Sequence, residues 1–151
     1  MGMFTALNIG GSGLTAQRFR LDVIANNIAN AETTRTTEGG PYQRQRVVLM
    51  PRDDSLKFKS HLLPEALQPG QGAGVKVVKV EKDNSPPRLV YDPSHPDAIK
   101  YGKYKGYVLY PNVNIVQEMV DLISASRAYE ANVTVINSTR QMFEKSLQIG
   151  R

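Results

Sequence analysis

Proline is confined to the middle of this chain. All nine prolines lie between Pro41 and Pro111, so the stretches 1–30 and 112–151 contain none. Because a proline inside a helix removes a hydrogen bond and clashes with the preceding turn, the two ends are where long unbroken helices can form. Most of the net charge of +5 lies in the middle, and the ends are more apolar. This partition predicts a mainly α fold with a small β insert.

The C-terminal end has the clearest hydrophobic periodicity. Large apolar residues occur at every seventh position and form one row, or seam, along the predicted helix: Ile115, Leu122, Tyr129, Ile136 and Phe143. A second, interrupted seam lies four residues later and consists of Met119, Val133 and Leu147. Heptads of this kind are typical of a helix that packs along another helix. With Asn112 as the N-cap and Gly150 as the stop, we expect one helix from about Val113 to Ile149.

The N-terminal end has a weaker heptad pattern. Its apolar residues are Leu7, Leu14, Leu21 and Ile28, with Ile24 beside them. Three glycines interrupt the first third, so we expect a firm helix from about Leu14 to Asn30 and a looser start, with Ser12 as a possible cap. From periodicity alone, two ordinary amphipathic helices of a compact bundle remain an equal alternative.

The C-terminal stripe is longer than its N-terminal counterpart. Burial of its eight seam side chains would contribute roughly 12 to 24 kcal/mol, whereas ordering about 37 residues costs roughly 1 to 2 kcal/mol each. The stripe therefore needs a partner, and the N-terminal heptads are too short to cover it. We expect part of the long helix to pack on another molecule, unless the middle of the chain covers the remainder.

The middle is composed of short β-favouring runs separated by glycine and proline. The runs are Arg46–Met50, Val75–Val80, Arg88–Tyr91 and Tyr107–Tyr110. They predict a small hairpin-rich unit. The stretch 53–74 has mixed charge and little alternation, and is predicted to be a mobile loop.

The composition argues against an enzyme. The chain has no cysteine and two histidines, which leaves almost no ligands for a metal site and excludes a thiol nucleophile. No nucleophile is paired with a base, so we expect no catalytic residue, no cofactor and no metal. No apolar run approaches the roughly 20 residues of a membrane span, and no basic residue precedes Arg18, as a secretory signal would require.

Two other motifs suggest different functions. The tripeptide His95-Pro96-Asp97 is the one that J-domain co-chaperones use, but two nearby prolines favour a turn instead of flanking helices. The stretch Lys100–Tyr110 interleaves tyrosines with lysines, as in proteins that bind single-stranded nucleic acid. A basic single-strand-binding module is therefore the alternative function, although a tyrosine-rich strand with lysines on its wet face is the simpler interpretation.

The two ends together resemble the flagellar rod and hook proteins of bacteria. The N-terminal match is SGLTAQRFRLDVIANNIANAET, residues 12–33, and the C-terminal match is YVLYPNVNIVQEMVDLISASRAYEANVTVINSTRQMFEKSLQIG, with DPSHPDA before it. The C-terminal stretch is similar specifically to the C-type proximal rod proteins of the flagellar basal body. The resemblance covers roughly half of the chain and does not extend to residues 53–74.

The resemblance implies an architecture and a role. The segments 1–33 and 107–151 would form a discontinuous core domain whose terminal helices pair as an antiparallel coiled coil, and 34–106 would form an outer β unit. Such proteins are exported unfolded through the flagellar type III apparatus. They polymerise helically in the periplasm into a rod that transmits torque and encloses the export channel. The implied partners are copies of the chain, other rod proteins, and the adaptor joining rod to membrane ring and export gate, with no nucleic acid and no direct membrane span.

The resemblance also marks individual residues. The asparagines of its N-terminal motif fall at Asn26, Asn27 and Asn30, where we expect the chain to leave the first helix through hydrogen bonds to the backbone or to a neighbouring subunit. Its C-terminal motif includes Arg127 and Glu130, which could pair within the helix or between chains. With the heptads, the expected assembly residues are Leu7, Leu14, Leu21, Ile24, Asn27, Ile28, Asn30, Ile115, Met119, Leu122, Arg127, Tyr129, Glu130, Asn132, Val133, Ile136, Phe143 and Leu147.

Overall fold

The described part of the chain forms two long helices and two β-hairpins. The computed structural model describes residues 3–52 and 74–149. Its elements, in chain order, are α1 (Met3–Ala29), β1 (Gln45–Pro51), β2 (Val75–Lys82), β3 (Arg88–Tyr91), β4 (Tyr107–Tyr110) and α2 (Ile115–Ile149). This confirms the mainly helical fold with a small β insert. The predicted loop at 53–74 lies almost entirely outside the described residues.

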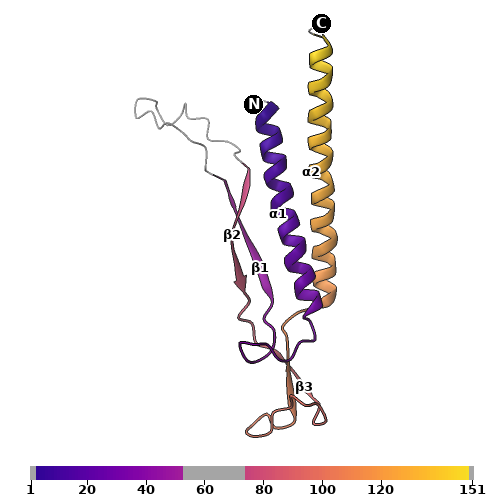
Figure 1. Cartoon of the computed structure of the whole chain (residues 1–151). Helices are drawn as coiled ribbons and strands as arrows, with labels where there is room; N and C mark the ends of the chain where they lie inside the picture. Colours follow the sequence, from indigo (N-terminus) through magenta and orange to yellow (C-terminus); the bar gives the residue numbers. More distant parts are fainter. Residues whose placement is uncertain (1–2, 53–73, 150–151) are drawn as a thin grey trace, which may run out of the picture.

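The two helices lie side by side and run in opposite directions. Their outer ends, at the two chain termini, point the same way (Figure 1). Residues near the start of α1 meet residues late in α2, since Gly10 lies against Ile136, and the end of α1 meets the start of α2, where Asn27 bonds Glu118. None of the described helices is long and apolar enough to cross a membrane.

The strands form two separate antiparallel hairpins, β1 with β2 and β3 with β4. The first hairpin packs along α1 on the side away from α2, so α1 lies between the hairpin and α2 (Figure 1). In this hairpin Val48 pairs with Lys79 and Leu49 pairs with Val77, so Val78 has no partner across the strands and is the extra residue of a β-bulge. The second hairpin extends beyond the inner end of the helices. All four predicted strands are confirmed, two of them with the same bounds.

The start of α1 differs from our expectation. The helix is continuous from Met3, so the glycine cluster does not loosen it. Ser12 is not a cap, because its hydroxyl donates to the Ile9 carbonyl within the helix and accepts the Val75 amide of β2 at 3.1 Å. Gly74 lies directly against Ser12, at a φ of +100° that a side chain rarely adopts. Tertiary packing therefore overrides the low helix propensity of glycine here.

The start of α2 also differs in detail. The N-cap is Asn114, whose Oδ1 accepts the backbone N–H groups of Val116 and Gln117 at 3.1 and 3.4 Å. The predicted cap, Asn112, lies two residues earlier and bonds other parts of the chain. The helix therefore begins at Ile115 and not at about Val113.

Candidate assembly interface

The inner seam of α2 is built from small and polar residues. Its buried side chains are seven residues apart at Glu118, Ala125 and Thr139, and half-buried Asn132 continues the same spacing. A second row of α2 that faces the rest of the chain comes from the predicted apolar stripe. Only the middle of that stripe takes part, through half-buried Leu122, Tyr129 and Ile136. The apolar pattern thus identified one of the two inner seams, and the other was invisible to a search for hydrophobic residues.

Two glycines of α1 allow α2 to approach closely. A Cβ atom added at Gly10 would lie 2.9 Å from Ile136 Cγ1, and one added at Gly13 would lie 2.9 Å from Asn132 Nδ2. Both distances are shorter than van der Waals contact. The glycine cluster is therefore a packing device that brings two backbones together, a role that we did not predict.

Matched glycine substitutions test this packing. Nothing lies within 4 Å of a Cβ added at Gly11, so Gly11→Ala is expected to raise the free energy of unfolding by about 0.5 to 1 kcal/mol through helix propensity. Gly10→Ala should instead lower the free energy of unfolding by about 1 kcal/mol, because the cost of overpacking against Ile136 is larger than the gain in helix propensity. Urea denaturation followed by circular dichroism measures both. Equal stabilisation by the two alanines would contradict the close approach.

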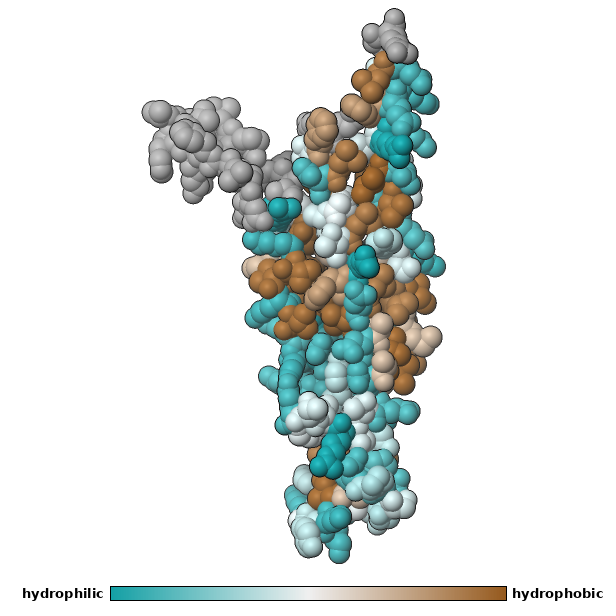
Figure 2. Space-filling view, viewed as in Figure 1, coloured by the Kyte–Doolittle hydropathy of each residue, from teal (hydrophilic) through white to brown (hydrophobic). Residues whose placement is uncertain are grey.

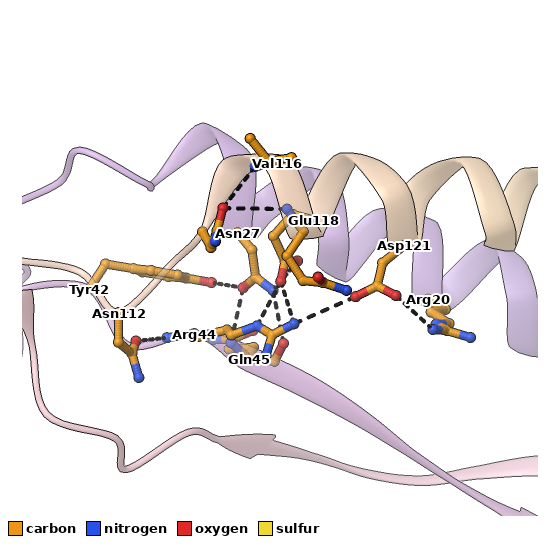
Figure 3. A network of polar contacts seen from close by, with 11 residues as sticks. Arg20, Asn27, Tyr42, Arg44, Gln45, Asn112, Val116, Glu118 and Asp121 are labelled. Carbon is orange, nitrogen blue, oxygen red and sulfur yellow. Dashed lines mark hydrogen bonds and ion pairs between the residues drawn. The ribbon is translucent and has the colours of Figure 1, made fainter.

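A buried polar cluster joins α1, the first hairpin and α2 at the inner end of the helix pair (Figure 3). Its centre is Asn27, whose side chain is 1% exposed. The Asn27 Oδ1 accepts the Gln45 amide and the Tyr42 hydroxyl, both at 2.9 Å. The Asn27 Nδ2 donates to the Gln45 carbonyl at 2.9 Å and to the Glu118 carboxylate at 3.0 Å. One side chain therefore fixes the positions of three elements.

The cluster also holds a nearly buried ion pair. Glu118 is 1% exposed, and its Oε1 receives Arg44 Nε and a terminal nitrogen of the same guanidinium, each at 2.6 Å. Arg44 lies just before β1, and its guanidinium also approaches Asp121 at 3.6 Å, as does that of Arg20 from α1. Since Glu118 is in the first turn of α2, the helix dipole favours its negative charge as well.

Neighbouring groups complete the cluster. Asn112 accepts the Arg44 amide at 3.0 Å and donates to the carbonyls of Asp83 and Ser85, so it ties β1 to the end of β2. Burial raises the pKa of the Tyr42 hydroxyl above its usual range, and the Glu118 carboxylate adds to the effect. Tyr42 therefore stays protonated and remains a hydrogen-bond donor at neutral pH.

The chain leaves α1 as expected. Asn30 donates to the backbone carbonyl of Asn26 at 2.9 Å, and Asn27 bonds the backbone of Gln45, so the predicted hydrogen bonds of these asparagines to backbone are confirmed. Sequence reasoning missed the side-chain partners of Asn27, which are Tyr42 and Glu118, and it missed Arg44, which pairs with Glu118. The only available signal was the heptad spacing of Glu118, Ala125 and Asn132, since Glu118 and Asn27 are far apart in sequence.

The residues expected to form the assembly surface fall into two groups. Twelve are buried or half-buried within the chain, namely Leu7, Leu14, Leu21, Ile24, Asn27, Ile28, Asn30, Leu122, Tyr129, Asn132, Val133 and Ile136. Six are exposed, namely Ile115, Met119, Arg127, Glu130, Phe143 and Leu147. The first group can shape an assembly by holding the fold together, and the second is available for contact with another molecule.

A group of exposed apolar side chains lies on the face of α2 away from α1. This outer patch consists of Val116, Met119, Val120 and Ile123, each more than half exposed. The residues are three or four apart and so share one face, opposite the buried Glu118 and Ala125. Figure 2 shows apolar side chains gathered over the first half of α2. Contiguous exposed apolar groups of this kind mark contact sites.

Arg127 and Glu130 continue the outer face along α2. Both are exposed, and neither side chain forms an ion pair with the other or with the rest of the described residues 3–52 and 74–149. Arg140 and Glu144, further along the helix, do pair at 3.0 Å. The charges at 127 and 130 are therefore available to a neighbouring molecule.

The other sequence motifs form no comparable site. Lys100–Tyr110 is a turn followed by β4, in which Tyr107 packs edge-on against Tyr91 and Tyr104. His95-Pro96-Asp97 lies in a turn, where Asp97 accepts the Thr34 hydroxyl at 2.8 Å, so the J-domain arrangement is excluded. In the part of the chain that the structure describes, no group of three acidic, histidine or cysteine side chains could hold a metal ion.

Comparisons with known proteins match the two helical ends of the chain to family models. Residues 7–35 match the family model described as "Flagella basal body rod protein", and residues 104–149 match "Flagellar basal body rod FlgEFG protein C-terminal". These matches cover most of α1, β4 and α2. They define the class of the protein as a flagellar rod protein.

Full-length relatives narrow the class further. The chain is 57% identical over 149 residues to "Flagellar basal-body rod protein FlgC" of Borreliella burgdorferi, covering 99% of this chain and 98% of that protein. It is 46% identical to FlgC of Bacillus subtilis and 40% identical to FlgC of Escherichia coli, with complete coverage of both chains in each comparison. The chain therefore belongs to the FlgC family of flagellar basal-body rod proteins. It is a structural component of the basal-body rod and not an enzyme.

Proposed function

We propose that this chain is a subunit of the proximal rod and that it polymerises helically through its terminal helices. In this proposal α1 and α2 form an antiparallel coiled coil that, with the segments 1–33 and 107–151, makes the core domain of the rod wall. The segment 34–106 is the outer unit. The assembled wall transmits torque and encloses the export channel, and subunits reach the periplasm unfolded through the type III apparatus.

The outer patch of α2 is the observation that carries this proposal. This chain buries few large side chains of its own. Among the described residues, its hydrophobic core consists of Ala16, Val23, Ile24, Ala31, Val108 and Ala125. The chain nevertheless leaves a contiguous apolar face on its longest helix exposed. An enzyme or a monomeric binding protein gains nothing from such a face, whereas a subunit of a polymer buries it at every contact.

The polar cluster suits a part that transmits torque. Torque applied to the outer unit must reach the helices, and Asn27, Arg44 and Glu118 connect the first hairpin to both helices through short, nearly buried bonds. Such bonds fix geometry more strictly than apolar contacts, because a displaced buried polar group loses its partner. The partners in the rod are copies of this chain, other rod proteins, and the adaptor to the membrane ring and export gate.

Self-association and location test the proposal. We expect sedimentation velocity of the purified full chain to show oligomers whose fraction rises with concentration. In the source bacterium, loss of the gene should abolish filaments, and antibody labelling of isolated basal bodies should place the protein in the rod. A chain that stays monomeric at every concentration and is missing from isolated basal bodies would contradict it. Salt-sensitive binding of single-stranded oligonucleotides would instead favour the alternative function of Lys100–Tyr110.

A further inference from the structure

One face of α1 carries two charges that have no partner within the described part of the chain. Arg18 and Asp22 are exposed, and neither forms an ion pair with the other or with the rest of residues 3–52 and 74–149. Exposed Ala25 and Ala29 continue the same face toward the end of the helix, because the four residues are three or four positions apart. These four residues are the free face of α1.

The outer face of α2 presents unpaired charges in a matching order. Along α2 the apolar outer patch comes first and ends at Ile123, and the unpaired charges of Arg127 and Glu130 follow it at the same spacing. Along α1 a positive and a negative charge come first, and the two alanines follow. If the two faces are laid against each other with the helices antiparallel, each charge meets one of opposite sign.

The spacing of the charges fixes the register of such a contact. With Arg127 opposite Asp22, Glu130 lies opposite Arg18 to within about one residue, since helical positions three and four apart are neighbours on one face. In the same register the apolar outer patch lies opposite the two alanines. Bulky apolar side chains then meet small ones, so the two helices can approach each other closely.

From these observations we infer that the outer patch of α2 in one copy docks on the free face of α1 in the next copy, with the two helices antiparallel. The inference deepens the proposed function and rests on it. Across the contact Arg127 pairs with Asp22, and Glu130 pairs with Arg18. The contact joins two unlike surfaces, so each copy keeps one unused surface on either side and the association continues from copy to copy.

The contact also displaces each copy along the helix axis. Within the chain, Asn27 lies beside Glu118 and Gly10 lies beside Ile136. The register between copies differs from this internal register by about three residues, or roughly 5 Å at ~1.5 Å per residue. A row of copies joined in this way therefore rises along the axis at every step, as subunits of a helical polymer do.

The chain has no cysteine, which allows a direct test. Val120→Cys and Ala29→Cys are prepared as separate single-cysteine variants of the full chain, mixed under associating conditions and treated with a short bismaleimide. The mixture should give about tenfold more cross-linked dimer than either variant alone, as expected for a contact between unlike faces. A chain that carries both cysteines should give a ladder of higher oligomers.

Two further variants test the register. Thr134→Cys and Thr15→Cys occupy exposed positions that the same register places opposite each other, so their mixture should give the cross-linked dimer as well. The crossed mixtures are Val120→Cys with Thr15→Cys and Thr134→Cys with Ala29→Cys. Their cysteines are mismatched by about 14 residues, or roughly 20 Å along the helix axis, so these mixtures should give no such dimer.

Charge reversal gives a second readout. Arg127→Glu in the Val120→Cys chain should lower the yield of the mixed dimer about three- to tenfold, and Asp22→Arg in the Ala29→Cys chain should restore it. Arg46→Glu, at an exposed position of β1, makes the same change of charge and should leave the yield unchanged.

If the matched mixtures give no more dimer than the crossed mixtures, or if Arg127→Glu leaves the yield unchanged, this inference is wrong. The proposed function stands in either case if the wild type associates. Both fall if the wild type stays monomeric at every concentration and is missing from isolated basal bodies.

Discussion

Replacing Glu118 by alanine is expected to lower the free energy of unfolding by about 3 kcal/mol. Removal of one partner of a buried ion pair typically costs about 3 to 5 kcal/mol, because the other charge is left without compensation, and partial exposure of Arg44 places this case at the lower end. The substitution also leaves the Asn27 amide without one acceptor. For a chain of this size the midpoint of thermal unfolding should fall by roughly 6 to 12 °C.

Control variants separate the causes of this loss. Glu130→Ala removes an exposed carboxylate from the same helix and should change stability by less than about 0.5 kcal/mol. Glu118→Gln keeps an acceptor for Asn27 but loses the charge opposite Arg44, so it should lie between the wild type and Glu118→Ala. The double variant Asn27→Ala with Glu118→Ala should cost about 0.5 to 3 kcal/mol less than the sum of the single variants, because the two residues share a hydrogen bond. Additive losses would show that the cluster does not act as a unit.

The secondary structure was largely predictable because it follows local rules. Proline placement bounded the helices, and β-favouring runs between glycines and prolines located the four strands. The helix starts were less predictable. A glycine at position 10 lowers local helix propensity, yet it is placed where α2 leaves no room for a Cβ atom. Only the position of a distant helix decides between a loose start and a tight contact.

The polar cluster could not be derived from residue patterns. Asn27 and Glu118 lie at positions that a hydrophobic stripe omits, and Arg44 belongs to an irregular segment whose course depends on the tertiary fold. The resemblance to rod proteins drew attention to Asn27, which is the centre of the cluster. The resemblance did not indicate which residues form hydrogen bonds with Asn27. Buried polar groups must be paired, but sequence alone does not say with which residue.

The outer patch of α2 should separate folding from assembly. Val120→Glu combined with Ile123→Glu changes two side chains that are more than half exposed, and glutamate has a higher helix propensity than either β-branched residue. The free energy of unfolding of the monomer should therefore change by less than about 1 kcal/mol. In the assembled rod the carboxylate at position 120 would be desolvated with no cationic side chain one turn away, at a cost of several kcal/mol for every contact. The carboxylate at position 123 lies one turn from Arg127 and adds a second polar group to the same face. We expect sedimentation to show monomers only, and cells with this variant to build no filament and not to swim, although the protein is made in normal amounts. Ser138→Glu adds a carboxylate to an exposed position of the same helix about four turns beyond the patch, and should leave swimming nearly normal. Normal filaments in the double variant would show that the exposed face of α2 is not an assembly surface.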